Sequence, residues 1–167
     1  FPTDAAEQFE KQFVARWTTS NVWTQKAYDA LVQKECPCVI LAHSQGGPFV
    51  FQAALNAPDK IKAVIVIEPA GAPDLAKLTK DELARLKQVP HVQILGDHIK
   101  YSPLWQKYRA NVGKYLEALK DSGVKVDTID LPSRGIFGNS HMIMMDKNSD
   151  QVAQIVQDWI RENGLMK

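Results

Sequence analysis

The stretch of the chain best suited to chemistry is CVILAHSQGGP, which runs from Cys38 to Pro48 and has a serine at its centre. Its apolar, β-branched start predicts a buried strand over 38–42, and a helix is expected from Pro48 onward. A serine on such an abrupt strand-to-helix turn exposes its Oγ as a nucleophile. Ala42 and the glycines after Gln45 are small, as required where two backbones approach closely. The Gln45 N–H would face a developing oxyanion, so the stretch predicts acyl transfer at Ser44.

A serine hydroxyl needs a general base, and the chain offers four histidines. His141 lies on the loop between the last predicted strand and the last helix, where a serine–acid–histidine chain order places the base. His98 follows a strand end and is the second candidate. His43 adjoins the serine, but its side chain is expected to point away and to line a pocket wall or pack. His91 opens a strand at the opposite end of the sheet, so we expect it to be structural.

Two carboxylates compete for the role of the acid that orients the base. Asp97 follows the third predicted strand, which is the commoner position, whereas Glu68 ends the strand next to the nucleophile and reaches one methylene further. An ionisable group that closes the run Val-Ile-Val-Ile is costly to bury without a partner. Asp97 could instead be a turn residue, Glu68 a loop charge, and Ser44 a helix cap. The residues alone leave these alternatives open.

The elements that must position these residues alternate along the chain. Strands are expected at 38–42, 61–67, 91–95 and 125–131, helices at 1–16, 24–34, 48–56, 81–87, about 105–119 and 151–162, and a loop at 17–23. This alternation predicts an α/β fold with an open parallel sheet of about four strands and helices on both faces. Ligands bind such sheets at the carboxyl ends of the strands, where Ser44, Glu68, Asp97 and the His141 loop all fall.

Composition restricts the class of protein. The chain has 167 residues, 45% of them hydrophobic, which indicates one globular domain with an apolar core. Its net charge of +1 gives no sign of nucleic-acid binding. It lacks the run of about 18 apolar residues that a membrane span requires. Cys36 and Cys38 are separated by one proline and are not expected to bridge each other, and two cysteines cannot supply a zinc site. No metal or cofactor is expected.

Several long segments resemble one group of bacterial α/β-hydrolase esterases, of the kind first described from Alcaligenes. The matching segments are LAHSQGG, VIVIEPAG, ILGDHI, LPSRGIFGNSHMIMMD and DWI, which together span roughly the last three quarters of the chain. The resemblance implies the α/β-hydrolase fold and a glutamate as the acid, so the triad becomes Ser44, Glu68 and His141. Asp97 remains the second choice for the acid. The resemblance also favours a periplasmic or extracellular location.

The resemblance implies that part of the hydrolase domain is missing from this chain. The second oxyanion-hole donor normally follows an earlier strand, but residues 1–35 are expected to be helix and loop, a lead-in or cap to a catalytic core at 36–167. The strand before Ser44 would then be an edge with an uncovered apolar face. We therefore expect the C-terminal half of a single hydrolase domain, with the N-terminal half as a second chain cleaved near Phe1 and still docked. A homo-oligomer is a further possibility.

The predicted function is hydrolysis of small carboxylic esters by a serine esterase. A thioesterase, lactonase or amidase would use the same residues, and a catalytically silent binding module on the same scaffold is the alternative from a different class. Substrate would lie against aromatic side chains from the loops. The candidate wall residues are His43, Trp17, Trp23, Tyr101, Trp105 and Phe137, although aromatic residues in loops are more often simply packed.

Overall fold

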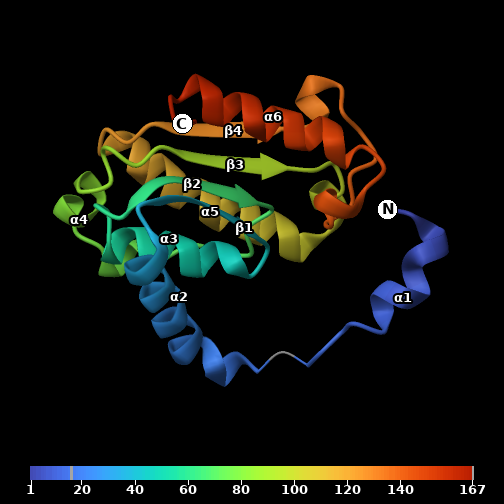
Figure 1. The fold of residues 1–167 in the computed structure, drawn as a ribbon, viewed down its shortest axis with the longest axis horizontal. Coiled ribbons are helices and arrows are strands. Elements are labelled where there is room, and N and C mark those ends of the chain that lie inside the picture. The colour runs from blue at the N-terminus through green and yellow to red at the C-terminus, as the bar shows by residue number, and fades with distance from the viewer. Residues whose placement is uncertain (16, 167) are drawn as a thin grey trace.

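A single parallel sheet forms the centre of the molecule. The computed structural model describes residues 1–15 and 17–166. Four strands, β1 (Cys38–His43), β2 (Ile61–Ile67), β3 (His91–Leu95) and β4 (Val126–Asp130), pair in the order β1-β2-β3-β4 (Figure 1). The predicted α/β class with about four parallel strands is confirmed. The runs at 61–67 and 91–95 have the predicted bounds, because β-branched residues fill them and turn residues flank them.

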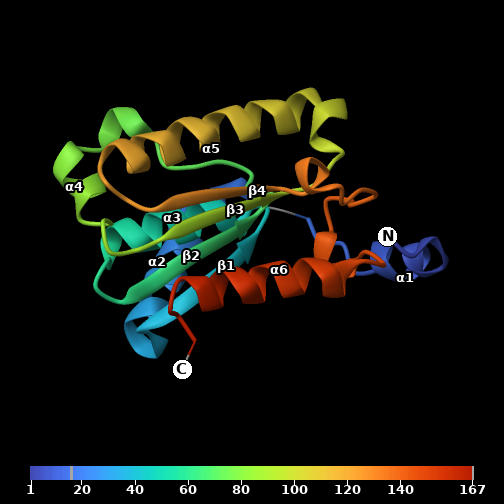
Figure 2. The same ribbon diagram turned by 90° about the horizontal axis from the view of Figure 1, so that it is seen from above.

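Helices cover both faces of this sheet, as Figure 2 shows from above. One face packs against α3 (Gly46–Asn56), α4 (Lys80–Ala84) and α5 (Pro103–Asp121), with Val64 and Val66 of β2 in the shared core. The other face packs against α6 (Ser149–Glu162), through Ile65 of β2 and the buried Trp159. The alternation of β2 side chains between two separate cores explains why six of its seven residues are apolar, with Lys62 as the exposed exception.

The N-terminal part of the chain differs from the prediction. A helix was expected over 1–16, but the structure has only a short 3₁₀ turn at Thr3–Ala5 and α1 (Ala6–Glu10), and position 16 lies outside the described residues. The loop expected at 17–23 is partly helical, since α2 (Asn21–Glu35) begins inside it. The residues that open α2 include no glycine or proline, so nothing in them prevents the helix from beginning at Asn21. In Figure 1, α1 stands apart from the sheet.

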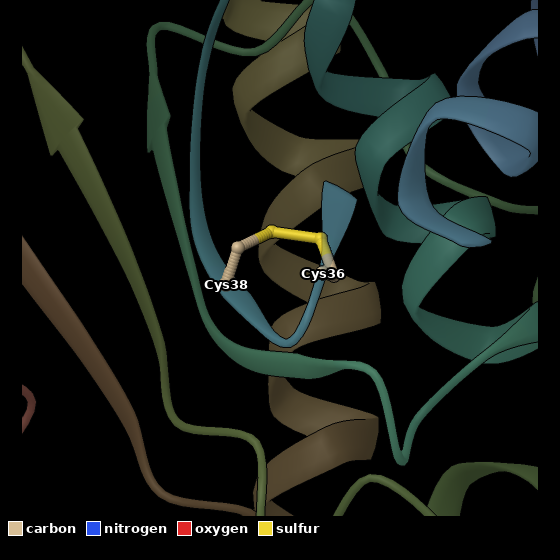
Figure 3. Close-up of a disulfide and its surroundings, with 2 residues drawn as sticks. All are labelled: Cys36 and Cys38. Carbon is tan, nitrogen blue, oxygen red and sulfur yellow. A yellow bond between two sulfur atoms is a disulfide. The ribbon is translucent and has the colours of Figure 1, made fainter. Parts of the chain in front are cut away.

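The cysteine prediction was wrong, because Cys36 and Cys38 form a disulfide (Figure 3). Cys36 is the C-cap of α2 and has an extended backbone, so the chain turns at Pro37 directly into β1. The turn brings the two Cα atoms to 4.5 Å, a separation that a disulfide can bridge. The spacing of the cysteines limits only the length of chain between them and does not give the direction of this turn.

Strand β1 forms an edge of the sheet, with β2 as its neighbour. Leu41 in the middle of β1 is 52% exposed, so this strand is not buried along its whole length as its sequence indicated. None of the helices in the described residues is long and apolar enough to cross a membrane.

Candidate active site

Ser44 occupies the sharp turn between β1 and α3. Its φ of +53° lies in the left-handed region, which non-glycine residues rarely adopt. The turn is held to the end of β2, since the Ser44 N–H donates to Ile67 O at 2.9 Å and the Ala70 N–H donates to Ser44 O at 2.9 Å. A Cβ on Gly47 would lie 2.5 Å from Pro69 Cβ, so only glycine fits there without displacing the neighbouring segment.

Ser44, His141 and Glu68 form a continuous hydrogen-bonded chain. Ser44 Oγ lies 2.9 Å from His141 Nε2, and His141 Nδ1 lies 2.6 Å from Glu68 Oε2. A carboxylate can only accept, so Nδ1–H donates to Glu68 and the free lone pair of Nε2 faces the serine hydroxyl. This tautomer is the one that a general base acting on Ser44 requires.

Glu68 is buried at the carboxyl end of β2, with an exposed fraction of 4%. Its φ is +40°, so the chain turns at this residue as it does at Ser44. The second carboxylate oxygen, Oε1, accepts a hydrogen bond from the Gly96 N–H at 2.9 Å. Both oxygens therefore have a donor, which compensates for the removal of the carboxylate from water.

Asp97 and His98, the second choices for acid and base, lie next to each other and make no hydrogen bond to Ser44 within the described residues. Asp97 Oδ2 accepts from the Gly138 N–H at 2.9 Å, and Oδ1 is 3.9 Å from His98 Nε2. Within the described residues, Asp97 makes no hydrogen bond to His141. Asp97 instead holds the loop on which His141 lies, and His98 has a mostly exposed side chain whose ring centroid is 6.0 Å from that of Tyr101.

His43 lies against His141 and does not turn away from the site as expected. The His43 Nε2 is 2.7 Å from His141 O, and the two ring centroids are 4.4 Å apart. Burial lowers the pKa of His43, although the hydrogen bond to His141 O opposes this shift. His43 is on the same face of β1 as Val39, and that face packs against the core that holds Ile143 of the His141 loop, so its side chain meets the loop there.

His91 is fully buried, as a structural role requires. Its Nδ1–H donates to Val89 O at 2.8 Å. Its ring stacks on Phe51 with a centroid distance of 6.0 Å. Burial lowers the pKa of His91 to about 4.

The loop that carries His141 is fixed by a cluster of polar residues that sequence reasoning missed. The Ser140 N–H and Oγ–H donate to the two oxygens of Asp146 at 2.8 and 2.7 Å. Asn139 is fully buried and donates to Asn148 Oδ1 at 2.9 Å. The closely spaced Asn, Ser and Asp residues in NSHMIMMDKN were the available signal, because such side chains commonly bond to nearby backbone groups.

A cavity of about 260 Å³ opens beside Ser44. Gln45, the N-cap of α3, lines it, and within the described residues its N–H donates to no backbone carbonyl. Trp105 also lines the cavity, and its ring centroid is 4.1 Å from that of His141. The other lining residues are Asn21, Pro48, Phe49, Ala70, Leu104 and Tyr108.

The remaining aromatic candidates for a pocket wall do not line this cavity. Trp17, Trp23, Tyr101 and Phe137 are all exposed, with fractions of 73%, 70%, 72% and 64%. Within residues 1–15 and 17–166, no group of three His, Cys, Asp or Glu side chains could hold a metal ion.

The family of the chain follows from comparison with known proteins. Residues 36–122 match the family model of the alpha/beta hydrolase fold, so the chain belongs to the α/β-hydrolase family. A solved bacterial esterase has 32% sequence identity and a TM-score of 0.82, over 98% of this chain and 51% of that chain. The probable secreted lipase phiG of Fungal sp. (strain ATCC 74256) is 25% identical over 95% of this chain and 55% of the lipase.

The chain therefore spans about half the length of these two relatives. More distant structures share the fold alone. A dienelactone hydrolase from Anabaena variabilis has 23% identity and a TM-score of 0.50, over 73% of this chain and 47% of that chain. A predicted CIB-like hydrolase from Thermoplasma acidophilum has 20% identity and a TM-score of 0.52, over 83% of this chain and 60% of that chain.

Proposed function

We propose that this chain carries the nucleophile, base and acid of a serine hydrolase that cleaves carboxylic esters through an acyl-enzyme. The observation that supports the proposal is the hydrogen-bonded chain from Ser44 Oγ through His141 to Glu68, with distances of 2.9 and 2.6 Å. The names of two relatives, an esterase and a probable lipase, agree with this chemistry.

In the proposed mechanism, Ser44 Oγ attacks the ester carbonyl carbon while His141 Nε2 takes its proton. The resulting imidazolium is stabilised by the Glu68 carboxylate, and the tetrahedral oxyanion accepts a hydrogen bond from the Gln45 N–H. The bond from carbon to the alcohol oxygen then breaks, and His141 returns the proton to the departing alcohol. Water, deprotonated by His141, attacks the acyl-enzyme; the bond from the acyl carbon to Ser44 Oγ then breaks, His141 returns the proton to Oγ, and the carboxylic acid is released.

Covalent labelling of the native protein, with the rest of the hydrolase domain present, tests this proposal. A fluorophosphonate probe should add one phosphonyl group to the protein at Ser44, as found by mass spectrometry of the digested chain. Ser44→Ala should abolish both the labelling and the hydrolysis of a p-nitrophenyl ester, while Ser140→Ala, which removes another serine of the site region, should still be labelled at Ser44. Absence of labelling on correctly folded protein would instead support a catalytically silent binding module.

The leaving group is not selected by the triad itself. We favour oxygen esters because of the two relatives, whereas a thioester, lactone or amide substrate would require the same nucleophile and base. Rates on a matched set with one acyl group and different leaving atoms would separate these activities. The proposal fails for esters if the thioester or amide has the highest kcat/KM.

We also propose that the rest of the hydrolase domain pairs with β1. Three observations support this partner. Leu41 is exposed on the β1 edge, and the site requires a second oxyanion donor from outside the elements described above. The relatives are also about twice as long as this chain. The partner would supply a strand parallel to β1 and the loop that follows it. Intact-mass analysis of native material under denaturing and non-denaturing conditions tests whether such a segment is present, contiguous or as a second chain. A monomer of 18.7 kDa that hydrolyses esters unaided would contradict this proposal.

An extracytoplasmic location is part of the same proposal. A disulfide between Cys36 and Cys38 is more stable in an oxidising compartment, and one relative is named as a probable secreted lipase. Alkylation of native protein without reductant should leave both cysteines unmodified. Alkylation of both cysteines in freshly isolated material would contradict the proposed location.

A further inference from the structure

We propose that His43 is a positioning residue, whose hydrogen bond to the backbone of His141 holds the base in line with Ser44. This inference rests on the proposed function, because it gives His43 a role in the same reaction. His43 itself makes no hydrogen bond to Ser44 or Glu68 among the described residues, so it acts through His141.

The hydrogen bond fixes the tautomer of His43 and holds the backbone of His141. His141 O is a carbonyl oxygen and can only accept, so His43 must carry its proton on Nε2 and donate it over 2.7 Å. The bond joins the last residue of β1 to a loop 98 positions later in the chain. His141 is thereby held at its backbone by His43 and at its ring by Glu68 and Ser44.

The rings around His141 further restrict its movement. The His43 ring centroid is 4.4 Å from that of His141, and the Trp105 ring centroid is 4.1 Å from it. His43 comes from β1 and Trp105 from α5, so two separate elements of the fold contact the base. A displacement of the base by about 1 Å can lower the catalytic rate about 100-fold, so contacts that restrict His141 affect the rate.

A matched pair of variants isolates the hydrogen bond. In His43→Gln the side-chain amide nitrogen takes nearly the position of Nε2 and can still donate to His141 O. In His43→Asn the same amide is one methylene shorter and cannot reach. Both variants lose the ring and keep the amide, so the difference between them reports whether the amide reaches His141 O. His98→Gln, on an exposed histidine outside the site, is the control for loss of an imidazole.

The first readout is kinetic and is taken on the native protein, with the rest of the hydrolase domain present. We expect His98→Gln to keep kcat for a p-nitrophenyl ester within about three-fold of the unmodified protein, and His43→Gln, which loses the ring contact but keeps the hydrogen bond, to lose clearly less than His43→Asn. We expect His43→Asn to lower kcat about ten-fold or more with KM nearly unchanged, because positioning affects the transition state more than substrate binding. Equal kcat for His43→Asn and the unmodified protein would overturn the proposal, as would equal losses for the Gln and Asn variants.

The second readout does not depend on turnover. The His141 Nδ1–H, which donates to Glu68 over 2.6 Å, should give a far-downfield proton resonance in NMR spectra. This resonance should persist in His43→Gln and broaden through faster solvent exchange in His43→Asn. An unchanged resonance in His43→Asn would overturn the positioning role. If the unmodified protein hydrolyses no ester and takes no probe, the proposed function fails, and this resonance still decides the role of His43.

Discussion

Ser44 and Glu68 are the two non-glycine residues with positive φ in the described part of the chain, at +53° and +40°. Such backbone conformations cost about 1–3 kcal/mol each and persist only where the surroundings enforce them. Here the Ser44 N–H and the Glu68 N–H donate to Ile67 O and Ile94 O, which anchors each turn to the neighbouring strand. The strain is thus located at the proposed nucleophile and acid, and both side chains meet at His141.

The identity of the acid can be tested by removing one negative charge at a time. Glu68→Gln keeps the size of the side chain but removes the charge that stabilises the imidazolium, and its amide can enforce the wrong tautomer of His141. We expect kcat to fall about 10³-fold or more. Asp97→Asn keeps an oxygen that can accept from the Gly138 N–H, so kcat should stay within about ten-fold. Steady-state ester hydrolysis measures both variants, and a larger loss in Asp97→Asn would reverse the assignment.

Gly96 leaves the space that the Glu68 carboxylate occupies. A Cβ at position 96 would lie 2.8 Å from Glu68 Oε1 and 3.2 Å from Asn139 O, so Gly96→Ala must displace one of them. We expect kcat to fall about 10- to 100-fold while the folded structure is retained, because a displaced acid no longer aligns His141. Gly113→Ala is the matched control, since a Cβ there meets nothing within 4 Å. Comparable rates for the two variants would show that Glu68 accommodates the methyl group.

Much of the site could be predicted from single residues, and the limits have physical causes. Ser44 and His141 were identifiable as the candidate nucleophile and base because a strand-to-turn motif and chain order restrict where such residues can lie. The residues alone did not distinguish Glu68 from Asp97, since both follow strand ends and only side-chain direction separates them. The contact of His43 with His141 depends on where a loop 98 positions later returns to the sheet, which no local sequence pattern gives.

Strands and long helices were predictable because their signals are local. The β-branched runs at β2 and β3 lie between proline, glycine and charged residues, so their bounds follow from the sequence. The start of α2 was misplaced because the Thr-Thr-Ser-Asn segment resembles a loop, while the residues after it continue the helix. The Cys36–Cys38 disulfide depends on the path of the chain between two elements, which spacing does not give.

His91, at the start of β3, makes the stability of the sheet depend on pH. Burial lowers its pKa from 6.5 to about 4, since its Nε2 is buried with no hydrogen-bond partner among the described residues. The unfolded chain therefore binds more protons between these values, and the free energy of unfolding should fall by about 3 kcal/mol as pH drops from 6.5 to 4. Urea unfolding across this range should show the loss.

A variant without the titrating group provides the comparison. His91→Leu has no proton to bind in the core, so the difference in unfolding free energy between it and the unmodified protein should change by about 3 kcal/mol over the same pH range. His98→Gln, on an exposed side chain, should leave the slope unchanged. A slope in His91→Leu equal to that of the unmodified protein would show that other groups cause the pH dependence.

The molecule as a whole is asymmetric across its sheet. Strand β4 packs beside β3 at one edge, while β1 at the other edge carries the exposed Leu41 between two apolar cavities. One cavity, of about 480 Å³, lies toward α6, and the other, of about 530 Å³, lies toward α2 and α3. An open apolar edge of this kind pairs readily with another strand, which agrees with a chain that spans half the length of its relatives.

The open edge predicts concentration-dependent association of the 167-residue chain with itself when no other segment covers β1. Leu41→Lys places a charge in the middle of the edge, where a pairing strand would have to bury it, so association should weaken about ten-fold or more. Tyr101→Lys, which replaces an exposed aromatic residue away from this edge, should associate as the unmodified chain does. Sedimentation velocity over a range of concentrations measures all three proteins. If the unmodified chain remains monomeric throughout, or if the two lysine variants behave alike, β1 is not the surface on which a partner strand docks.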